Sequence, residues 1–123
     1  MQPRALVAAF VAGVAGCTTQ PLTPGEPRIV ERVVIAPYQL HDQCTRLETG
    51  DRLDWRYESS EPVLFNIHYR DGNADMSPIV REHSMTDAGT FDARSPQAYC
   101  LTWEAGAGGA VIGYRLLLRP AAR

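Results

Sequence analysis

The chain of 123 residues contains no lysine, since all twelve of its basic residues are arginine. Chemistry that needs a lysine amine, such as Schiff-base formation, is therefore excluded. Fourteen acidic residues outnumber the basic ones and leave a net charge of -2. A chain without excess positive charge has little with which to hold a phosphate backbone, so we expect no nucleic-acid partner.

The sequence also lacks the spacings that mark catalytic and metal sites. It has no G-x-S-x-G motif and no C-x-x-C pair, and His41, His68 and His83 lie at no recognised metal-ligand spacing. A domain of this size has little room for a cleft that would raise the pKa of a catalytic carboxyl group. We therefore expect a protein without enzymatic activity, cofactor or metal. A small hydrolase and a metal site assembled across strands remain as alternatives.

Long hydrophobic runs are missing except near the start of the chain. Residues 1–16 combine a positive start at Arg4 with an apolar run from Ala5 to Gly16, which is too short to span a bilayer as a mature helix. The run ends in Val14-Ala15-Gly16-Cys17, which resembles the lipobox of bacterial lipoproteins. This resemblance implies a signal peptide over residues 1–16 and a lipid on the Cys17 sulfur. An ordinary secretory signal cut nearby is the alternative.

The same resemblance predicts where the protein is located. Two or more acyl chains hold a protein firmly on a bilayer, so the anchor would be stable and the domain would face the periplasm. Thr18 stands where such lipoproteins carry an aspartate when they are retained in the inner membrane. We therefore expect the outer membrane.

A proline-rich stretch follows the lipobox cysteine. With prolines at 21, 24 and 27, residues 18–28 are expected to form an extended spacer of roughly 20 to 30 Å that contributes nothing to a core. The sequence thus divides into a signal peptide (1–16), a lipidated cysteine with its spacer (17–28) and one folded domain (29–123).

Hydrophobic residues in the domain alternate with polar ones, which is typical of half-buried strands. The pattern is clearest over 53–57 and 63–69, with turns expected at 49–51, 58–62 and 71–73. Further strands are expected at 29–36, 40–47, 98–104 and 110–119. Residues 77–85 fit either a helix or a strand, and the strand is favoured. This pattern predicts an all-β fold, a two-sheet antiparallel β-sandwich of seven to eight strands.

Cys44 and Cys100 remain as an even pair once Cys17 is lipidated. In an oxidising compartment the simplest interpretation is one intramolecular disulfide between them, and the chain-entropy model gives it roughly 4 kcal/mol of stabilisation. A metal site with a nearby histidine, or a redox pair, is the alternative.

The order of these features resembles the GOLD domain family. Cys44 leads through Gly50-Asp51 into the strand from Leu53, and Gly89-Thr90-Phe91 and Tyr99-Cys100-Leu101 follow, over roughly 80 residues from Gln39 to Leu118. Trp103-Glu104-Ala105 stands where family members often have an asparagine, and the family's transmembrane segment and coiled coil are missing. The resemblance implies a β-sandwich with a single disulfide at equivalent positions and a non-catalytic role in binding proteins.

Five residues are candidates for a binding surface. Trp103 would be exposed if Cys100 faced the space between the sheets, and an exposed tryptophan marks many interfaces. The others are Tyr38, His68 on the polar side of its strand, and Arg115 and Arg119, which suit contact with lipid phosphates or an acidic polymer. The predicted function is a lipid-anchored module of the cell envelope that binds a protein partner. Binding of carbohydrate or peptidoglycan is the alternative.

Overall fold

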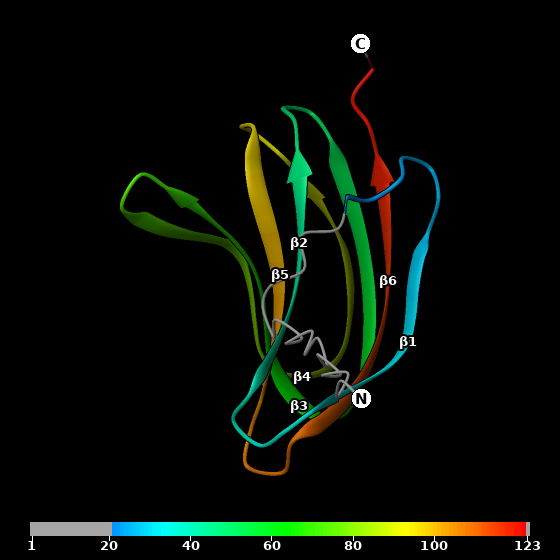
Figure 1. Cartoon of the computed structure of the whole chain (residues 1–123), viewed down its shortest axis with the longest axis vertical. Helices are drawn as coiled ribbons and strands as arrows, with labels where there is room; N and C mark the ends of the chain where they lie inside the picture. The colour runs from blue at the N-terminus through cyan, green and yellow to red at the C-terminus, as the bar shows by residue number, and fades with distance from the viewer. Residues whose placement is uncertain (1–20, 123) are drawn as a thin grey trace, which may run out of the picture.

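The computed structural model describes residues 21–122, and its regular structure consists of antiparallel β-strands. The predicted signal peptide and Cys17 lie outside these residues. None of the described residues forms a helix long and apolar enough to cross a membrane. The predicted all-β antiparallel fold is confirmed, with residues 77–85 inside a strand. The strands are β1 (Arg28–Ile35), β2 (Leu40–Leu47), β3 (Arg52–Asp71), β4 (Ala74–Asp92), β5 (Gln97–Ala105) and β6 (Ala110–Arg119) (Figure 1).

The long strands β3 and β4 belong to both layers of the sandwich. Residues 52–59 of β3 pair with β6, whose other edge pairs with β1. Residues 63–68 pair with β5, whose other edge pairs with β2. β4 follows the opposite edge of β3 through both halves. We name the two layers the β6 layer and the β5 layer after these strands.

The turn predicted at 58–62 is wrong, because these residues form the bend at which β3 passes from one layer to the other. The pairing with β4 shifts register between Glu58 and Val63. Ser59 is buried at the bend, where its hydroxyl donates a hydrogen bond to the carbonyl of Glu61. Serine side chains satisfy irregular backbone in this way. The strand continues through the bend, and residues 21–122 form six strands, close to the seven to eight expected.

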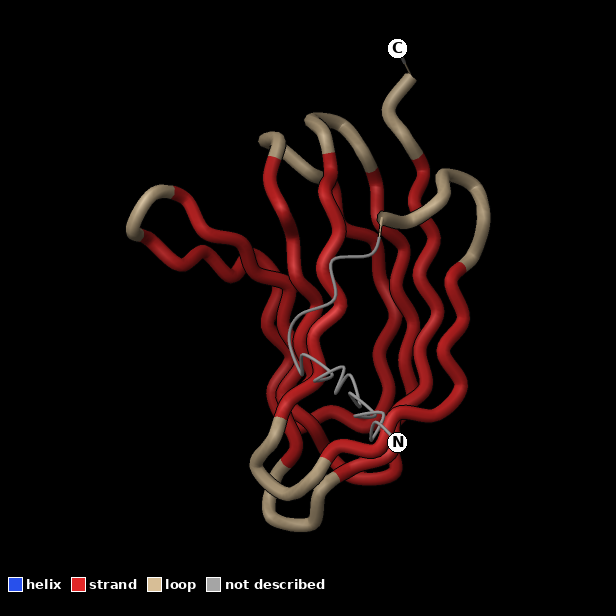
Figure 2. Tube along the Cα trace, in the orientation of Figure 1, coloured by secondary structure: helices blue, strands red, loops and turns tan. Residues whose placement is uncertain are grey.

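Beyond its pairing with β5, the β3–β4 hairpin projects from the sandwich as a two-stranded arm (Figure 2). Tyr69 opposite Met76 and Arg70 opposite Asp75 are paired along it. Tyr69 packs its ring against Tyr99, with centroids 5.0 Å apart, and so fixes the base of the arm to the core. Met76 is exposed on the arm.

The core lies between the two layers and follows the predicted alternation. The inward residues of β3 are buried on both sides of the bend, and alternate residues of β5 and β6 meet them. Burial of this apolar surface is the main force that holds the layers together. Members of the core include Leu53, Trp55, Tyr57, Phe65, Ile67, Phe91, Tyr99, Leu101, Trp103, Ile112, Tyr114 and Leu116.

Trp103 lies at the centre of this core, so the prediction that it is exposed is wrong. Its exposed fraction is 0%. Its ring stacks on Tyr114 with centroids 4.5 Å apart and lies 5.4 Å from the ring of Phe65. The prediction required Cys100 to face inward. Cys100 instead lies on the outer face of the β5 layer, and because side chains alternate along a strand, Trp103 faces the core.

Part of the proline-rich segment packs on the domain, so fewer residues are left to act as a spacer than the sequence predicts. Leu22 has an exposed fraction of only 6% and belongs to the core. The backbone N–H of Gly25 donates to the carbonyl of Leu118 at 2.9 Å, and a guanidinium N–H of Arg28 donates to the carbonyl of Pro21. A single buried leucine among prolines produces no periodic signal. The expectation that nothing in this segment contributes to the core is therefore wrong from Pro21 onward.

The inward face of β2 is polar and meets β6 across the core. The hydroxyl of Tyr114 donates to Oε1 of Gln43 at 3.2 Å and lies 3.0 Å from Nε2 of His41. The imidazole also lies against Trp103, with ring centroids 5.9 Å apart. Burial lowers the pKa of His41 from its ordinary value of 6.5, and the nearby charge of Asp42 opposes this only in part.

This histidine predicts a loss of stability in mild acid. Below the ordinary pKa of 6.5 the unfolded chain binds a proton at His41 that the folded chain resists, so the free energy of unfolding falls as the pH falls. Urea unfolding between about pH 7.5 and 5.5 measures this dependence. His41→Gln is expected to flatten the slope, and His83→Gln, on the exposed part of β4, is the control. Equal slopes for wild type and His41→Gln would contradict the prediction.

Candidate functional site

The two ends of the sandwich differ in what they present. The first described residues, 21–25, lie beside the end of β6, and we name this end the proximal end. The opposite, distal end consists of the β1–β2 turn (36–39), the β5–β6 turn (106–109) and the bend of β3 (Figure 1). Segments far apart in the sequence therefore meet at the distal end.

A recess of about 490 Å³ opens at the distal end. The β1–β2 turn, β3 just after its bend, the facing part of β4 and the end of β5 converge on it. Its lining residues are Tyr38, Pro62, Val63, Leu64, Glu82, His83, Glu104, Ala105 and Gly106. We name it the distal recess.

Two residues of the distal recess adopt the left-handed backbone conformation. Tyr38 has φ 60° and His83 has φ 54°, and they are the non-glycine residues with positive φ in the described chain. This conformation is unfavourable for residues with a side chain, and it persists where the surrounding structure enforces it. The N–H of Tyr38 donates to the carbonyl of Gly106 at 3.1 Å, so the two distal turns hold each other.

The side chains of the distal recess combine an aromatic ring with carboxylates. Tyr38 is 70% exposed. Such high exposure is unusual for tyrosine, because its ring is largely apolar and is commonly buried at least in part. Glu82 and Glu104 lie in the same lining, with Leu64 and Pro62 as apolar neighbours. An exposed tyrosine beside hydrogen-bonding groups is suited to contact another molecule, since its ring buries much surface and its hydroxyl bonds.

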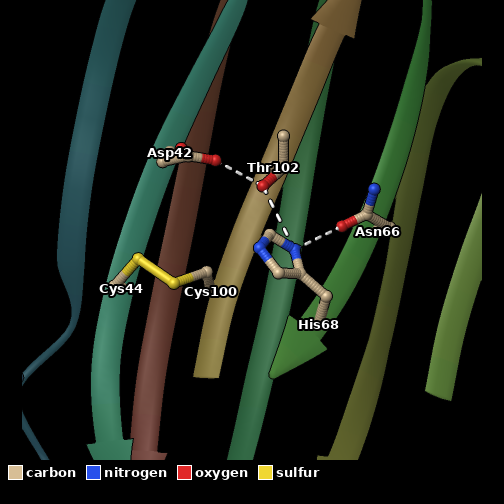
Figure 3. Close-up of a disulfide and its surroundings, with 6 residues drawn as sticks. All are labelled: Asp42, Cys44, Asn66, His68, Cys100 and Thr102. Atoms are coloured by element: carbon tan, nitrogen blue, oxygen red, sulfur yellow. Dashed lines mark hydrogen bonds between the residues drawn. A yellow bond between two sulfur atoms is a disulfide. The ribbon is translucent and has the colours of Figure 1, made fainter. Parts of the chain in front are cut away.

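The predicted disulfide is confirmed and lies away from this recess. Cys44 and Cys100 are paired opposite each other on β2 and β5, with an S–S distance of 2.03 Å (Figure 3). It joins two neighbouring strands of one layer on the outer face. It fixes the register of β2, the edge strand of the β5 layer.

His68 lies on the same outer face, in a row of polar side chains next to the disulfide (Figure 3). Its Nδ1 lies 2.7 Å from Oδ1 of Asn66 and 3.4 Å from the hydroxyl of Thr102. The hydroxyl of Thr102 donates a hydrogen bond to the carboxylate of Asp42. A nucleophilic hydroxyl would have to pass its proton to the imidazole, so this row holds strands together and does not have the geometry of a catalytic triad.

Arg115 and Arg119 lie on the outer face of the β6 layer. Arg119 forms an ion pair with Asp54, with Nε 2.9 Å from the carboxylate. Arg115 is exposed and stands opposite Arg56 of β3. The structure thus places the predicted residues in separate regions: Tyr38 at the distal end, His68 and the two arginines on opposite outer faces, and Trp103 in the core.

Nothing in the sequence indicates that Glu82, His83 and Glu104 line the same recess as Tyr38. Glu82 and His83 lie in β4 opposite residues 63–65 of β3, just after the bend, and a bend that appears as a turn in the sequence gives no sign of this pairing. The sequence suggests for His83 only the role of a metal ligand. Among residues 21–122, no group of three or more histidine, cysteine or acidic side chains is arranged to hold a metal ion.

Comparison with known proteins gives a likeness of fold. No protein-family model matches the sequence, and no curated protein matches it. The structure is similar to that of PliG from Aeromonas hydrophila, a periplasmic lysozyme inhibitor of g-type lysozyme, with a TM-score of 0.63 and 10% identity over 84% of this chain and 97% of that one. It is also similar to the pre-peptidase C-terminal domain of collagenase from Bacillus anthracis, with a TM-score of 0.56 and 8% identity over 85% of this chain and 97% of that one.

Identities this low establish the fold alone, and the resemblance to the GOLD domain family stays a prediction. This chain therefore has an all-β fold that is also found in a periplasmic lysozyme inhibitor.

Proposed function

We propose that this protein is a lipid-anchored, non-catalytic module of the bacterial cell envelope that binds a protein partner through its distal recess. The observation that carries the proposal is Tyr38, which is 70% exposed and held in a left-handed conformation at the lip of that recess. Aromatic residues of this kind dominate binding energy at protein interfaces. The likeness in fold to a periplasmic inhibitor of g-type lysozyme, an inhibitor whose target is a protein, supports the same function.

The position of Leu22 limits the distance between the domain and the membrane. Pro21 follows Cys17 by four positions, and an extended chain spans at most about 14 Å over that length. The lipid would therefore hold the proximal end close to the outer membrane, on its periplasmic side. The distal recess lies at the other end of the sandwich, where a partner in the periplasm can reach it.

The anchor predicts a change of compartment in the Cys17→Ser variant. Without the sulfur that carries the lipid, the protein is expected to move from the membrane fraction to the soluble periplasm, since no acyl chain then holds it. Fractionation followed by immunoblotting measures this. Mass spectrometry of the wild-type N-terminus is the accompanying check. An unmodified Cys17, or an unchanged membrane partition of the variant, would contradict lipid anchoring.

The distal recess predicts that Tyr38→Ala loses the partner while the fold is retained. After crosslinking in intact envelopes, the wild-type protein should retain one stoichiometric partner, and the variant should retain it at least about tenfold less, the loss expected for an aromatic anchor. Met76→Ala, another exposed apolar residue but on the projecting arm, is the matched control. Equal recovery with wild type and Tyr38→Ala would refute the role of the recess.

A g-type lysozyme is the first purified partner to test, because the inhibitor with a similar fold acts on that class of enzyme. Clearing of a peptidoglycan suspension by the lysozyme should slow when the mature protein is added, and Tyr38→Ala should restore it. Unimpeded clearing at saturating protein would exclude this partner.

Binding of peptidoglycan itself is the second candidate, and the same residue favours it. An exposed tyrosine ring can stack on a sugar while the neighbouring carboxylates accept hydrogen bonds from the hydroxyl groups of that sugar. Cosedimentation of the purified protein with insoluble peptidoglycan, in the absence of any other protein, separates the two functions. Retention that Tyr38→Ala abolishes would assign the recess to glycan.

A further inference from the structure

The outer face of the β6 layer carries four arginines in two directly opposed pairs. Arg52 stands opposite Arg119, and Arg56 stands opposite Arg115. Their side chains point outward because the residues between them along β3 and β6 face the core. Like charges directly opposite each other on neighbouring strands destabilise a sheet. Such pairs therefore need compensation by negative charge.

One of the two pairs has that compensation within the protein. Nε of Arg52 lies 3.0 Å from the carboxylate of Asp92, and Nε of Arg119 lies 2.9 Å from that of Asp54. In the described part of the chain, Arg56 and Arg115 form no ion pair. Glu58, two residues from Arg56 on the same face, does not come within ion-pair distance of either guanidinium.

A recess of about 670 Å³ opens beside the uncompensated pair. Arg56, Arg115 and Arg119 line it, with Leu117 among its apolar residues. Asp54 is its one carboxylate, and Arg119 and the hydroxyl of Thr90 already occupy that group. Guanidinium groups bind phosphate oxygens through paired N–H donors, so the recess is suited to a phosphate group.

We propose that this face of the β6 layer rests on the membrane and that Arg56 and Arg115 bind phospholipid headgroup phosphates there. Three features favour the lipid as the source of the phosphate. Ile29 stands opposite Arg115 on β1 and is 62% exposed, which places an apolar side chain next to the two charges. Ile29, Arg115 and Arg56 lie side by side on the neighbouring strands β1, β6 and β3. A flat membrane surface can therefore contact all three side chains at once.

The third feature is the point at which the chain reaches the domain. Pro21 lies against Arg28 at the start of β1, the edge strand of this same layer. A lipid on Cys17, at most about 14 Å further along the chain, would hold this layer beside the bilayer. The inference rests on the proposed lipid anchor and adds an orientation to it.

The test measures headgroup binding without the anchor. The mature chain carrying Cys17→Ser is mixed with vesicles of phosphatidylglycerol and phosphatidylcholine, and bound protein is measured by sedimentation. Adding Arg56→Gln and Arg115→Gln should lower the partition coefficient roughly tenfold to thirtyfold, as expected for two arginines at a charged surface. The double variant relieves a like-charge contact, so its thermal unfolding should be no lower than that of the parent.

Arg70→Gln with Arg94→Gln is the matched control, because it removes the same charge from the projecting arm and the β4–β5 loop. Equal losses in the two double variants would overturn the assignment, since they would show only a general effect of charge. If the parent protein did not bind vesicles but still bound inorganic phosphate or poly-glutamate, the lipid would be excluded as the occupant of this site. Neither result would affect the proposed roles of Tyr38 in partner binding and of Cys17 in lipid anchoring, because the tests of those roles do not depend on headgroup binding.

Discussion

Trp103→Ala is expected to lower the free energy of unfolding by about 3 to 5 kcal/mol, the usual loss when a large aromatic side chain is removed from a core. Its ring stacks on Tyr114, and the rings of Phe65, Tyr57 and His41 surround it. These residues come from both layers, so the cavity left by the ring would open at their junction. Little of it can close, because the neighbours are rigid rings held by their own strands.

Urea unfolding followed by circular dichroism measures this loss. Met76→Ala, on the exposed arm, is the control and should change stability by no more than about 0.5 kcal/mol. Trp103→Phe should fall between the two, since it keeps an aromatic ring in the stack. A loss of under about 1 kcal/mol in Trp103→Ala would contradict the packing described above.

Removal of the disulfide is expected to cost about 4 kcal/mol. Cys44 and Cys100 are separated by 56 positions in the sequence, and the chain-entropy model gives a loop of that length this order of stabilisation. The free energy of unfolding of a whole domain is about 5 to 15 kcal/mol, so the loss is a large share of it. The bond also holds β2, which pairs with a single neighbour, in register with β5.

Two measurements check this expectation. The variant Cys44→Ala with Cys100→Ala should unfold at lower urea concentration than wild type, and reductant should lower the wild-type midpoint in the same direction. Reductant should leave the variant unchanged, which controls for effects on other groups. If wild type and variant unfolded at the same urea concentration, the disulfide would have no role in stability.

The sequence predicts the strands well where a single physical signal governs them. Burial of one face imposes an alternation that is readable at Leu53, Trp55 and Tyr57 and again at Phe65 and Ile67. The number of cysteines, together with the predicted oxidising compartment, leads to the disulfide without knowledge of the fold. Both inferences depend only on local pattern or composition.

The remaining features depend on contacts that no local pattern encodes. Ser59 and Glu61 have the composition of a turn, yet hydrogen bonding within the segment lets β3 bend and continue. The side chain of Trp103 points into the core because that of Cys100 points outward. Alternation along a strand predicts two opposite faces, but it does not say which of them is buried. Tyr38 was predicted as a surface residue, but its neighbours in the distal recess come from strands distant in the sequence.

The place of β6 in its layer has a consequence for how the protein is made. β6, the last of the described strands along the chain, lies between β1 and β3, so it forms the interior of that layer and not its edge. Until residues 110–119 have been synthesised, β1 lacks the described strand with which it pairs, and the edge of β3 over residues 52–59 stays unpaired. A nascent chain that stops at residue 109 would thus expose two unsatisfied strand edges to its surroundings, a known route to aggregation.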